Sequence, residues 1–311
     1  MSRVLLSIQG LHPKQWYDLL SARRMVVLEP DGPEDPSIDY AVVWKQPPGM
    51  LSTLPNLKAI FSIGAGVDHI FADPDVPDVP IVRVVADNLS QYMREYVVWR
   101  VLAHHRQEMT YRDLQSGATW RELQQPTAND VSVGIMGFGQ LGRAAAATLL
   151  QIGFKVNGWS RRETSMEGVS TFAGDDRLSP FLGNTDILVV LLPLTTATHG
   201  IIDYGILKQL RPDGAPGGPA LINAGRGQLQ KEADILRALE DGTLKEASLD
   251  VFETEPLPAG SALWAHPRVF VTPHAAATSD PDYLVPLMLA QMDACDRGEP
   301  LVNLVDRTAG Y

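Results

Sequence analysis

VSVGIMGFGQLG, residues 131–142, carries the strongest indication of the fold in this chain. Its first part, Val131–Met136, is an apolar run typical of a strand that is buried on both faces of a parallel sheet. Gly137, Gly139 and Gly142 follow with the spacing G-x-G-x-x-G, and a helical segment comes next. In this context the first glycine permits the tight turn, the second lets the backbone approach a pyrophosphate, and the third allows helix–strand packing. The stretch predicts a dinucleotide site at a helix N-terminus; the alternative is a glycine-rich turn without a ligand.

Short apolar runs alternate with helical segments on both sides of this stretch. Runs of this length are typical of strands in parallel sheets that are covered on both faces. Besides Val131–Met136, the expected strands are Val4–Ile8, Met25–Leu28, Tyr40–Trp44, Leu57–Ile63, Ile81–Val84, Lys155–Trp159, Ile187–Leu192, Ala220–Asn223, Ala247–Val251 and Val269–Thr272. A long helix is predicted over residues 90–115, and a last helix over Asp282–Arg297. This alternation predicts an α/β fold with parallel sheets.

The composition excludes several classes of protein. Of the 311 residues, 45% are hydrophobic and 20% are charged, which is typical of a soluble globular protein. The sequence contains no run of about 18 or more apolar residues, so no transmembrane helix and no membrane partner are expected. The formal net charge of −11 argues against a nucleic-acid partner, which needs a clustered positive surface. The single cysteine, Cys295, cannot form an internal disulfide, and this fits a cytoplasmic location. No metal site is predicted.

The end of the second strand in the predicted nucleotide-binding unit distinguishes between two cofactors. Proteins that prefer NAD place an acidic residue there, about 20 residues after the glycine loop, to bind the ribose 2′-hydroxyl. This chain instead has Ser160, Arg161 and Arg162, and the first acid is Glu163. Two arginines and a hydroxyl suit a 2′-phosphate through charge-assisted hydrogen bonds. We therefore expect NADP(H) as the cofactor; the alternative is a solvated basic turn.

Five motifs in order resemble those of the D-isomer-specific 2-hydroxyacid dehydrogenase family, and they span nearly the whole chain. They are FSIGAGVDHI at 61–70, LLPLTTATHGII at 191–202, NAGRG at 223–227, SLDVFETEPLP at 248–258 and VTPHAAAT at 271–278. The closest subgroup in appearance is the glyoxylate/hydroxypyruvate reductase A type, through Trp44, the turn 160–162 and the ending 303–307. The resemblance implies reduction of a small 2-keto acid to the D-2-hydroxy acid.

Three residues carry the chemistry that the resemblance implies. Arg226 would supply a planar cation for the substrate carboxylate and carbonyl. His274 would donate the proton in reduction and accept it in oxidation, because histidine titrates near neutrality. Glu255 would hydrogen-bond His274, fix its orientation and favour its protonated form. Asp250 resembles the family residue on the carboxamide side of the nicotinamide, so we interpret it as a cofactor contact. Each residue taken singly has a structural alternative, such as a loop cap or a core histidine.

The resemblance also assigns binding residues in both halves of the chain. Backbone N–H groups at Ala65, Gly66 and Val67 would bind the substrate carboxylate, and Trp44 would limit substrate size. The remaining cofactor contacts are expected at Phe138, Gln140, Leu141, Leu192, Pro193, Thr198, Ala224 and Gly225, together with Arg226 and His274. The other histidines, including His69 and His104, lack such a context.

The resemblance further implies two Rossmann- or flavodoxin-like domains with an active site in the cleft between them. We expect a substrate domain of residues 1–98 plus 280–311 and an NADP-binding domain of residues 99–279. A homodimer is expected as well. Two alternatives stay open: a dehydrogenase for another 2-keto acid such as phenylpyruvate, and a non-catalytic nucleotide-sensing protein on the same fold.

Overall fold

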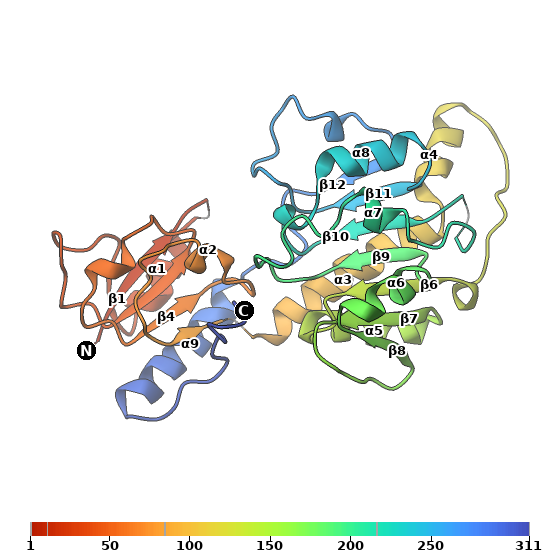
Figure 1. The fold of residues 1–311 in the computed structure, drawn as a ribbon. Helices are drawn as coiled ribbons and strands as arrows, with labels where there is room; N and C mark the ends of the chain where they lie inside the picture. The colour runs from red at the N-terminus through yellow and green to blue at the C-terminus, as the bar shows by residue number, and fades with distance from the viewer. Residues whose placement is uncertain (1, 11, 84, 216, 311) are drawn as a thin grey trace. The chain divides into compact units, whose positions relative to one another are not determined.

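The computed structural model describes residues 2–10, 12–83, 85–215 and 217–310. The chain forms two compact units, which are coloured by residue number in Figure 1. One combines Met1–Leu89 with Ser279–Tyr311, and the other is Ser90–Thr278. The first boundary between them and the expected boundary after residue 98 both fall inside one helix, α3 (Asp87–His105).

The sheet of the first unit has five strands, all paired in parallel. They are β1 (Arg3–Ile8), β2 (Met25–Val27), β3 (Tyr40–Trp44), β4 (Ala59–Ser62) and β5 (Ile81–Val82). Their order, β2-β1-β3-β4-β5, is that of a flavodoxin-like sheet. Strand β5 ends at Val82, and Val84 of the expected strand lies outside the described residues.

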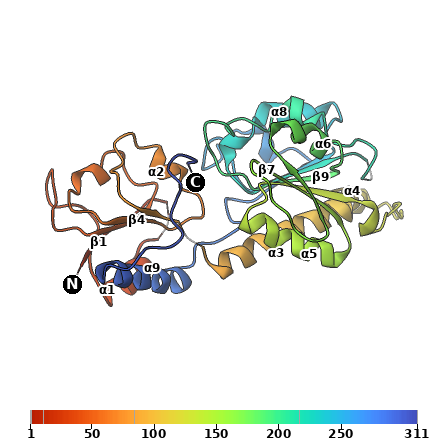
Figure 2. The same ribbon diagram turned by 60° about the horizontal axis from the view of Figure 1, so that its bottom comes forward.

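Side chains of β3 alternate between the two cores of this unit, as the period of a strand requires. Tyr40 and Val42 face a core made with α1 (Lys14–Ser21) and α9 (Pro281–Asp296), whereas Ala41 and Val43 face a core that includes Ile70. Ile70 belongs to α2 (Asp68–Phe71). Figures 1 and 2 show α1 and α9 side by side on one face of the sheet. The last helix therefore returns to the N-terminal unit.

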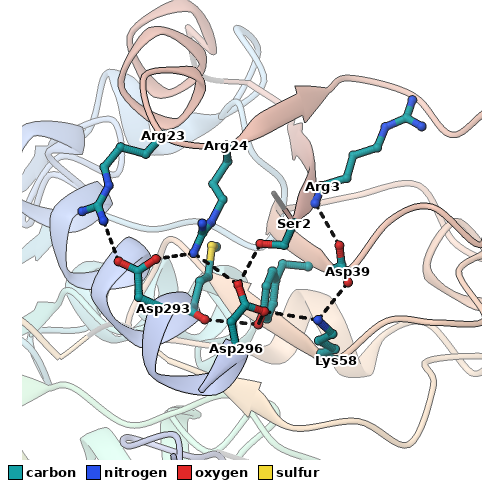
Figure 3. Close-up of polar contacts among 10 residues, drawn as sticks. Ser2, Arg3, Arg23, Arg24, Asp39, Lys58, Asp293 and Asp296 are labelled. Carbon is teal, nitrogen blue, oxygen red and sulfur yellow. Dashed lines mark hydrogen bonds and ion pairs between the residues drawn. The ribbon is translucent and has the colours of Figure 1, made fainter. Parts of the chain in front are cut away.

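A cluster of ion pairs holds the end of α9 against this unit (Figure 3). Arg23 and Arg24 bind Asp293 at 2.7 and 2.5 Å. Lys58 binds Asp296 at 3.2 Å, and the Tyr40 hydroxyl donates to the same carboxylate at 2.8 Å. Arg24 is almost buried in this cluster. The cluster ties the C-terminal helix to strand β3 and to the segment before β2.

The sheet of the second unit has seven parallel strands. They are β6 (Ser132–Met136), β7 (Lys155–Ser160), β8 (Val169–Ala173), β9 (Ile187–Val190), β10 (Ala220–Asn223), β11 (Glu246–Leu249) and β12 (Val269–Val271). The order β12-β11-β10-β9-β6-β7-β8 is the doubly wound order of dinucleotide-binding sheets, extended by one strand. The order reverses between β6 and β9, and ligands of such sheets bind at this switch point. Two parallel-sheet α/β units confirm the predicted fold class.

Helices cover both faces of the second sheet. Helices α3 and α5 (Gln140–Ile152) pack into one core, with Val97, Val101 and Leu149 among its buried residues. The opposite core contains residues of α6 (Leu178–Leu182), α7 (Tyr204–Leu207) and α8 (Glu232–Glu240). Figure 2 shows α3 and α5 lying along one side of this unit and α6 and α8 along the other.

Two local features differ from the sequence-based expectation. The helix expected over residues 90–115 is wrong, because the chain forms α3 and then α4 (Glu108–Ser116). Gln107 separates them with a left-handed φ of 57°, which ends the first helix. Strand β8 was not expected, because its partly exposed residues include Ser170 and Thr171 and give little apolar signal. Over the described residues, no helix is long and apolar enough to cross a membrane.

Candidate active site

The three glycines after β6 have three distinct environments. Gly137 adopts a φ of 107°, and an added Cβ would lie 2.5 Å from the Leu191 carbonyl carbon. A Cβ on Gly142 would lie 2.5 Å from the Gly137 oxygen, so only glycine lets α5 pack this closely. A Cβ on Gly139 would meet nothing within 4 Å. The open position beside the helix start is where a phosphate can approach the backbone.

Gly139 is also the N-cap residue of α5, and no side chain caps this helix end. The first N–H groups of a helix have no partner inside the helix, and here they belong to Gln140 and Leu141. The open helix start and the absence of a Cβ at Gly139 together form a cradle that an anionic group fits.

The basic turn directly follows the neighbouring strand. Strand β7 ends at Ser160, whose hydroxyl donates to the Arg162 carbonyl at 2.7 Å. Arg161 and Arg162 are exposed. Phe138, from the glycine loop, packs on β7, since a Cβ on Gly158 would lie 2.6 Å from its ring. The glycine loop and the basic turn are thus adjacent parts of one surface.

The chain after β9 meets the glycine loop at the switch point. Leu192 is buried and Pro193 is half-buried. The Thr198 hydroxyl donates to the Pro193 carbonyl at 2.8 Å and accepts from the Thr195 N–H at 2.8 Å. These bonds close a turn at Pro193 and Thr198, directly after Leu192, whose backbone N lies 2.7 Å from a Cβ built on Gly137.

Arg226 lies in a tightly packed loop after β10. Its Nη1 donates to the Gly225 carbonyl at 2.9 Å. A Cβ on Gly227 would lie 1.7 Å from the Phe252 oxygen, so the loop presses directly on the chain after β11. Asn223 donates to the Gln230 side chain at 2.8 Å, and Gln230 donates to the Val251 carbonyl at 3.0 Å. This buried amide pair fixes both ends of the loop that carries Arg226.

His274 and Glu255 form a hydrogen-bonded pair. Nδ1 of His274 lies 2.9 Å from Oε2 of Glu255, and both side chains are partly exposed. The other carboxylate oxygen accepts from the Phe252 N–H at 3.3 Å. His274 has a φ of 53°, a left-handed conformation that is uncommon outside glycine and costs free energy at functional sites. With the carboxylate at Nδ1, Nε2 is the ring nitrogen left for proton transfer.

Asp250 anchors the segment that carries His274. Its buried carboxylate accepts from the Thr272 hydroxyl at 2.6 Å and from the N–H groups of Ala275 and Ala276 at 2.8 and 2.9 Å. Its backbone carbonyl accepts from the His274 N–H at 2.7 Å. The buried Asp250 carboxylate therefore holds the backbone of the His274 loop in place.

A buried tyrosine extends this anchor. The Tyr96 hydroxyl lies 2.8 Å from the Thr272 hydroxyl, and burial raises the pKa of the Tyr96 phenol. Because the phenol stays neutral, it can serve Thr272 as a hydrogen-bond partner while Thr272 donates to Asp250.

The first unit places its predicted residues after β3 and β4. A Cβ on Gly64 would lie 2.4 Å from the Trp44 ring, so the loop before α2 packs directly on this indole. The Ser62 hydroxyl bonds the carbonyls of Gly64 and Gly66 at 3.1 and 3.2 Å and lies 3.2 Å from His69 Nε2. The loop containing Ala65, Gly66 and Val67 is thereby held in a compact turn.

His104 and His105 are both buried at the end of α3, and His104 packs against β11. His104 bonds the Glu246 carboxylate at 2.7 Å and the Ser248 hydroxyl at 2.8 Å. Burial lowers the pKa of His104. Glu246 is the first residue of β11, whereas Asp250 and Glu255 follow the end of that strand. Among the described residues, no group of three or more His, Cys, Asp or Glu side chains could hold a metal ion.

Residues 98–276 match the model of the D-isomer specific 2-hydroxyacid dehydrogenase family, in its NAD binding domain. The chain belongs to this family. The glyoxylate/hydroxypyruvate reductase A of Salmonella choleraesuis is 43% identical over 279 residues, which are 88% of each chain.

Solved structures agree with this membership. The dehydrogenase is similar to the NADPH-dependent glyoxylate/hydroxypyruvate reductase of Sinorhizobium meliloti, solved with NADP and sulfate (44% identity, TM-score 0.93, 100% of each chain). It is equally similar to a probable 2-hydroxyacid dehydrogenase of Rhizobium etli, solved with NADP, HEPES and tartaric acid (43% identity, TM-score 0.93, 100% of each chain).

Neighbouring strand ends bring the predicted residues of this dehydrogenase together. Arg226 follows β10, Asp250 and Glu255 follow β11, and His274 follows β12. Carboxyl ends of adjacent parallel strands lie at one edge of a sheet.

Sequence reasoning missed several supporting residues of the dehydrogenase. Asn223 lies inside the NAGRG motif and Gln230 just beyond it, but nothing in the sequence pairs their amides. The sequence assigns no role to His69, yet its ring packs against the Trp44 ring with centroids 4.7 Å apart. Its place next to Asp68 in the GAGVDH stretch was the only available signal.

Proposed function

We propose that this dehydrogenase uses NADPH to reduce a small 2-keto acid, glyoxylate or hydroxypyruvate, to the D-2-hydroxy acid. The observation that carries the proposal is the His274–Glu255 pair at 2.9 Å, on strand ends that neighbour the Arg226 loop and in the same unit as the glycine loop. The names of the relatives in Salmonella and Sinorhizobium support the substrate class.

The residues of this unit fit a phosphorylated dinucleotide. The pyrophosphate would lie at Gly137–Gly142, where Gly139 leaves open space before an uncapped helix. Ser160, Arg161 and Arg162 would hold the 2′-phosphate, and Leu192, Pro193, Thr198, Ala224 and Gly225 would line the rest of the site. When bound, NADPH supplies the hydride and its two electrons. Asp250 would contact the carboxamide side of the nicotinamide while its carboxylate keeps its hydrogen bonds to the His274 loop.

The catalytic steps assigned to this chain concern charge and one proton. Arg226 would bind the keto-acid carboxylate and polarise the carbonyl, where a planar cation stabilises developing negative charge. His274 would donate its Nε2 proton to the carbonyl oxygen as the alkoxide forms. Glu255 would keep the imidazole oriented and balance its positive charge before the transfer.

The substrate assignment also draws on the other unit. Backbone N–H groups at Ala65, Gly66 and Val67 would bind the carboxylate, since successive N–H groups in a turn attract anions. Trp44 would restrict the substrate to small keto acids. The close packing of its ring on Gly64 supports this role, because it places the indole directly beside the loop that would bind the carboxylate.

Turnover with a panel of substrates tests the proposal. Glyoxylate, hydroxypyruvate, pyruvate and phenylpyruvate are each supplied with NADPH or NADH, and nicotinamide absorbance is followed. The fastest oxidation is expected with NADPH and glyoxylate or hydroxypyruvate. A preference for NADH would contradict the cofactor assignment alone. Fastest turnover of phenylpyruvate would favour the alternative substrate, and cofactor binding without any turnover would favour a nucleotide-sensing protein.

We further propose that the dehydrogenase is a homodimer. The support comes from the outer surface of the second unit, where Trp120 is fully exposed on the extended segment after α4. Trp99 and Tyr111 of the same unit are also exposed and line an open groove between α3 and α4 with Leu102. Aromatic side chains of this size are enriched in interfaces between proteins.

Replacement of Trp120 by alanine is expected to weaken the dimer, so that it dissociates at a higher protein concentration than the wild type. Truncating a central aromatic anchor weakens an interface by about 2 kcal/mol or more, which is roughly 30-fold in the dissociation constant. Light scattering during size-exclusion chromatography over a dilution series measures the mass at each protein concentration. Trp264→Ala, at another exposed tryptophan of this unit, is the control and should leave the mass unchanged. A Trp120→Ala protein with the same mass as the wild type would contradict this interface.

The remaining assignments follow the composition. A cytoplasmic location is proposed because Cys295 is the single cysteine. The chain therefore has no internal disulfide, which is usual for proteins of reducing compartments. No nucleic-acid partner is proposed, in keeping with the net charge of −11.

A further inference from the structure

Arg143 occupies a position that joins the two halves of the nucleotide surface. It lies in the first turn of α5, and its backbone N–H donates to the Gly139 carbonyl at 2.9 Å. Its guanidinium reaches across to the segment after the basic turn. There Nη1 donates to the Ser165 carbonyl at 2.9 Å, and Nη2 donates to the Thr164 hydroxyl. One side chain thus connects the helix at the glycine loop to the chain that leaves Arg162.

An aromatic ring supports the same guanidinium. The Arg143 Cζ lies 5.3 Å from the centroid of the Phe138 ring, a distance at which a cation and a ring attract each other. Phe138 is buried and packs on Gly158 of β7. The rigid strand therefore positions the ring, the ring positions the guanidinium, and the guanidinium positions residues 164–165.

We propose that Arg143 is a positioning residue for cofactor choice, which fixes the turn Ser160–Arg162 in the shape that receives a 2′-phosphate. This inference rests on the proposed function, since it assumes that the basic turn binds this group. A turn held at both ends loses less conformational freedom when it binds a ligand. The strand β7 holds one end of the turn, and Arg143 holds the other.

The expected effect is selective, because NADH lacks the 2′-phosphate. Arg143→Met keeps a long side chain but removes the planar donor. Its dissociation constant for NADPH should rise about tenfold, because the released turn must be ordered when the 2′-phosphate binds. Its dissociation constant for NADH should change much less. Titration of cofactor fluorescence measures both constants, and displacement of bound NADPH by adenosine 2′,5′-bisphosphate or by AMP repeats the comparison with ligands that lack a nicotinamide.

Two further variants separate positioning from charge and from general damage. Arg237→Met makes the same change in the same unit, where the guanidinium of α8 lies 4.0 Å from the centroid of the Tyr204 ring; the NADPH/NADH ratio should stay at the wild-type value. Arg143→Lys keeps the positive charge, but an ammonium group lacks the planar set of donors with which the guanidinium binds Thr164 and Ser165 together. Lysine should therefore restore only part of the discrimination.

The possible outcomes separate a failure of the Arg143 role from a failure of the proposed NADPH dependence. Equal affinity of the wild type for NADPH and NADH would refute the cofactor assignment itself. A wild-type preference that survives unchanged in Arg143→Met, or that Arg143→Lys restores completely, would refute the positioning role alone. If Arg143→Met does not fold, Thr164→Val removes the hydroxyl acceptor instead, and a smaller shift in the same direction is expected. An unchanged ratio in Thr164→Val would then overturn the inference.

Discussion

Replacement of His274 by asparagine is expected to lower kcat by roughly 10²–10⁴-fold, the usual contribution of a positioned general acid. Asparagine cannot give up a proton at neutral pH, so the alkoxide would have to take one from water. The backbone should survive the change, because asparagine tolerates left-handed conformations such as the φ of 53° at His274. Steady-state turnover with the preferred keto acid measures the loss, and fluorescence titration should give an unchanged NADPH affinity.

Two comparisons make the His274 result specific. His12→Asn changes an exposed histidine of the other unit and should leave turnover at the wild-type value. Glu255→Gln keeps a hydrogen-bond acceptor beside Nδ1 but removes the negative charge, so it should reduce kcat less than His274→Asn. Turnover that is unaffected by His274→Asn would refute the role of this histidine.

Asp250→Asn is expected to impair both stability and turnover. The carboxylate accepts three hydrogen bonds from Thr272, Ala275 and Ala276, whereas an amide offers one oxygen and one NH₂ group. Whichever way the amide is turned, at least one N–H or O–H donor faces another donor. Losing a buried hydrogen bond to a charged group costs about 2–3 kcal/mol, or roughly 4–12 °C in the midpoint of thermal unfolding for a unit of this size.

The loss of turnover in Asp250→Asn should arise from the displaced His274 loop. Calorimetry measures the stability, and kcat is measured well below the unfolding temperature so that unfolded protein does not contribute. Asp203→Asn is the control: this carboxylate accepts from the Ile206 N–H at the start of α7 at 3.0 Å, and asparagine is as good an N-cap as aspartate. If Asp250→Asn unfolded at the wild-type temperature, the carboxylate would not be an anchor of this loop.

Local patterns in the sequence were sufficient to predict the glycine loop and the strand ends that carry the proposed catalytic side chains. The glycine spacing follows a buried strand, and β6, the turn and α5 lie where that pattern places them. Arg226, Glu255 and His274 belong to motifs at the ends of β10, β11 and β12, and parallel pairing brings such ends to one edge. The pairing of His274 with Glu255, expected from their motifs, agrees with the 2.9 Å contact.

Features that depend on contacts between distant segments could not be predicted. The break at Gln107 needs one left-handed residue, which a periodic apolar pattern does not reveal. Strand β8 is a half-exposed edge strand, so its sequence lacks the continuous apolar run of the central strands. The Asn223–Gln230 pair and the Arg143 contacts join side chains whose hydrogen-bonding groups have many possible partners in a sequence. Only the fold selects among them.

The return of α9 to the first unit affects the order in which the chain can fold as it is synthesised. Residues Ser90–Thr278 form one continuous unit, and domains generally fold as units while the chain emerges. The first unit contains Met1–Leu89, including α1, but one side of its core stays incomplete until Leu284, Met288 and Met292 of α9 are synthesised. The sheet of the first unit therefore has a partly uncovered apolar face, shielded by α1 alone, while the nucleotide-binding unit is translated. The unit with the glycine loop is therefore fully synthesised before the N-terminal unit is complete, although synthesis of the N-terminal unit starts earlier.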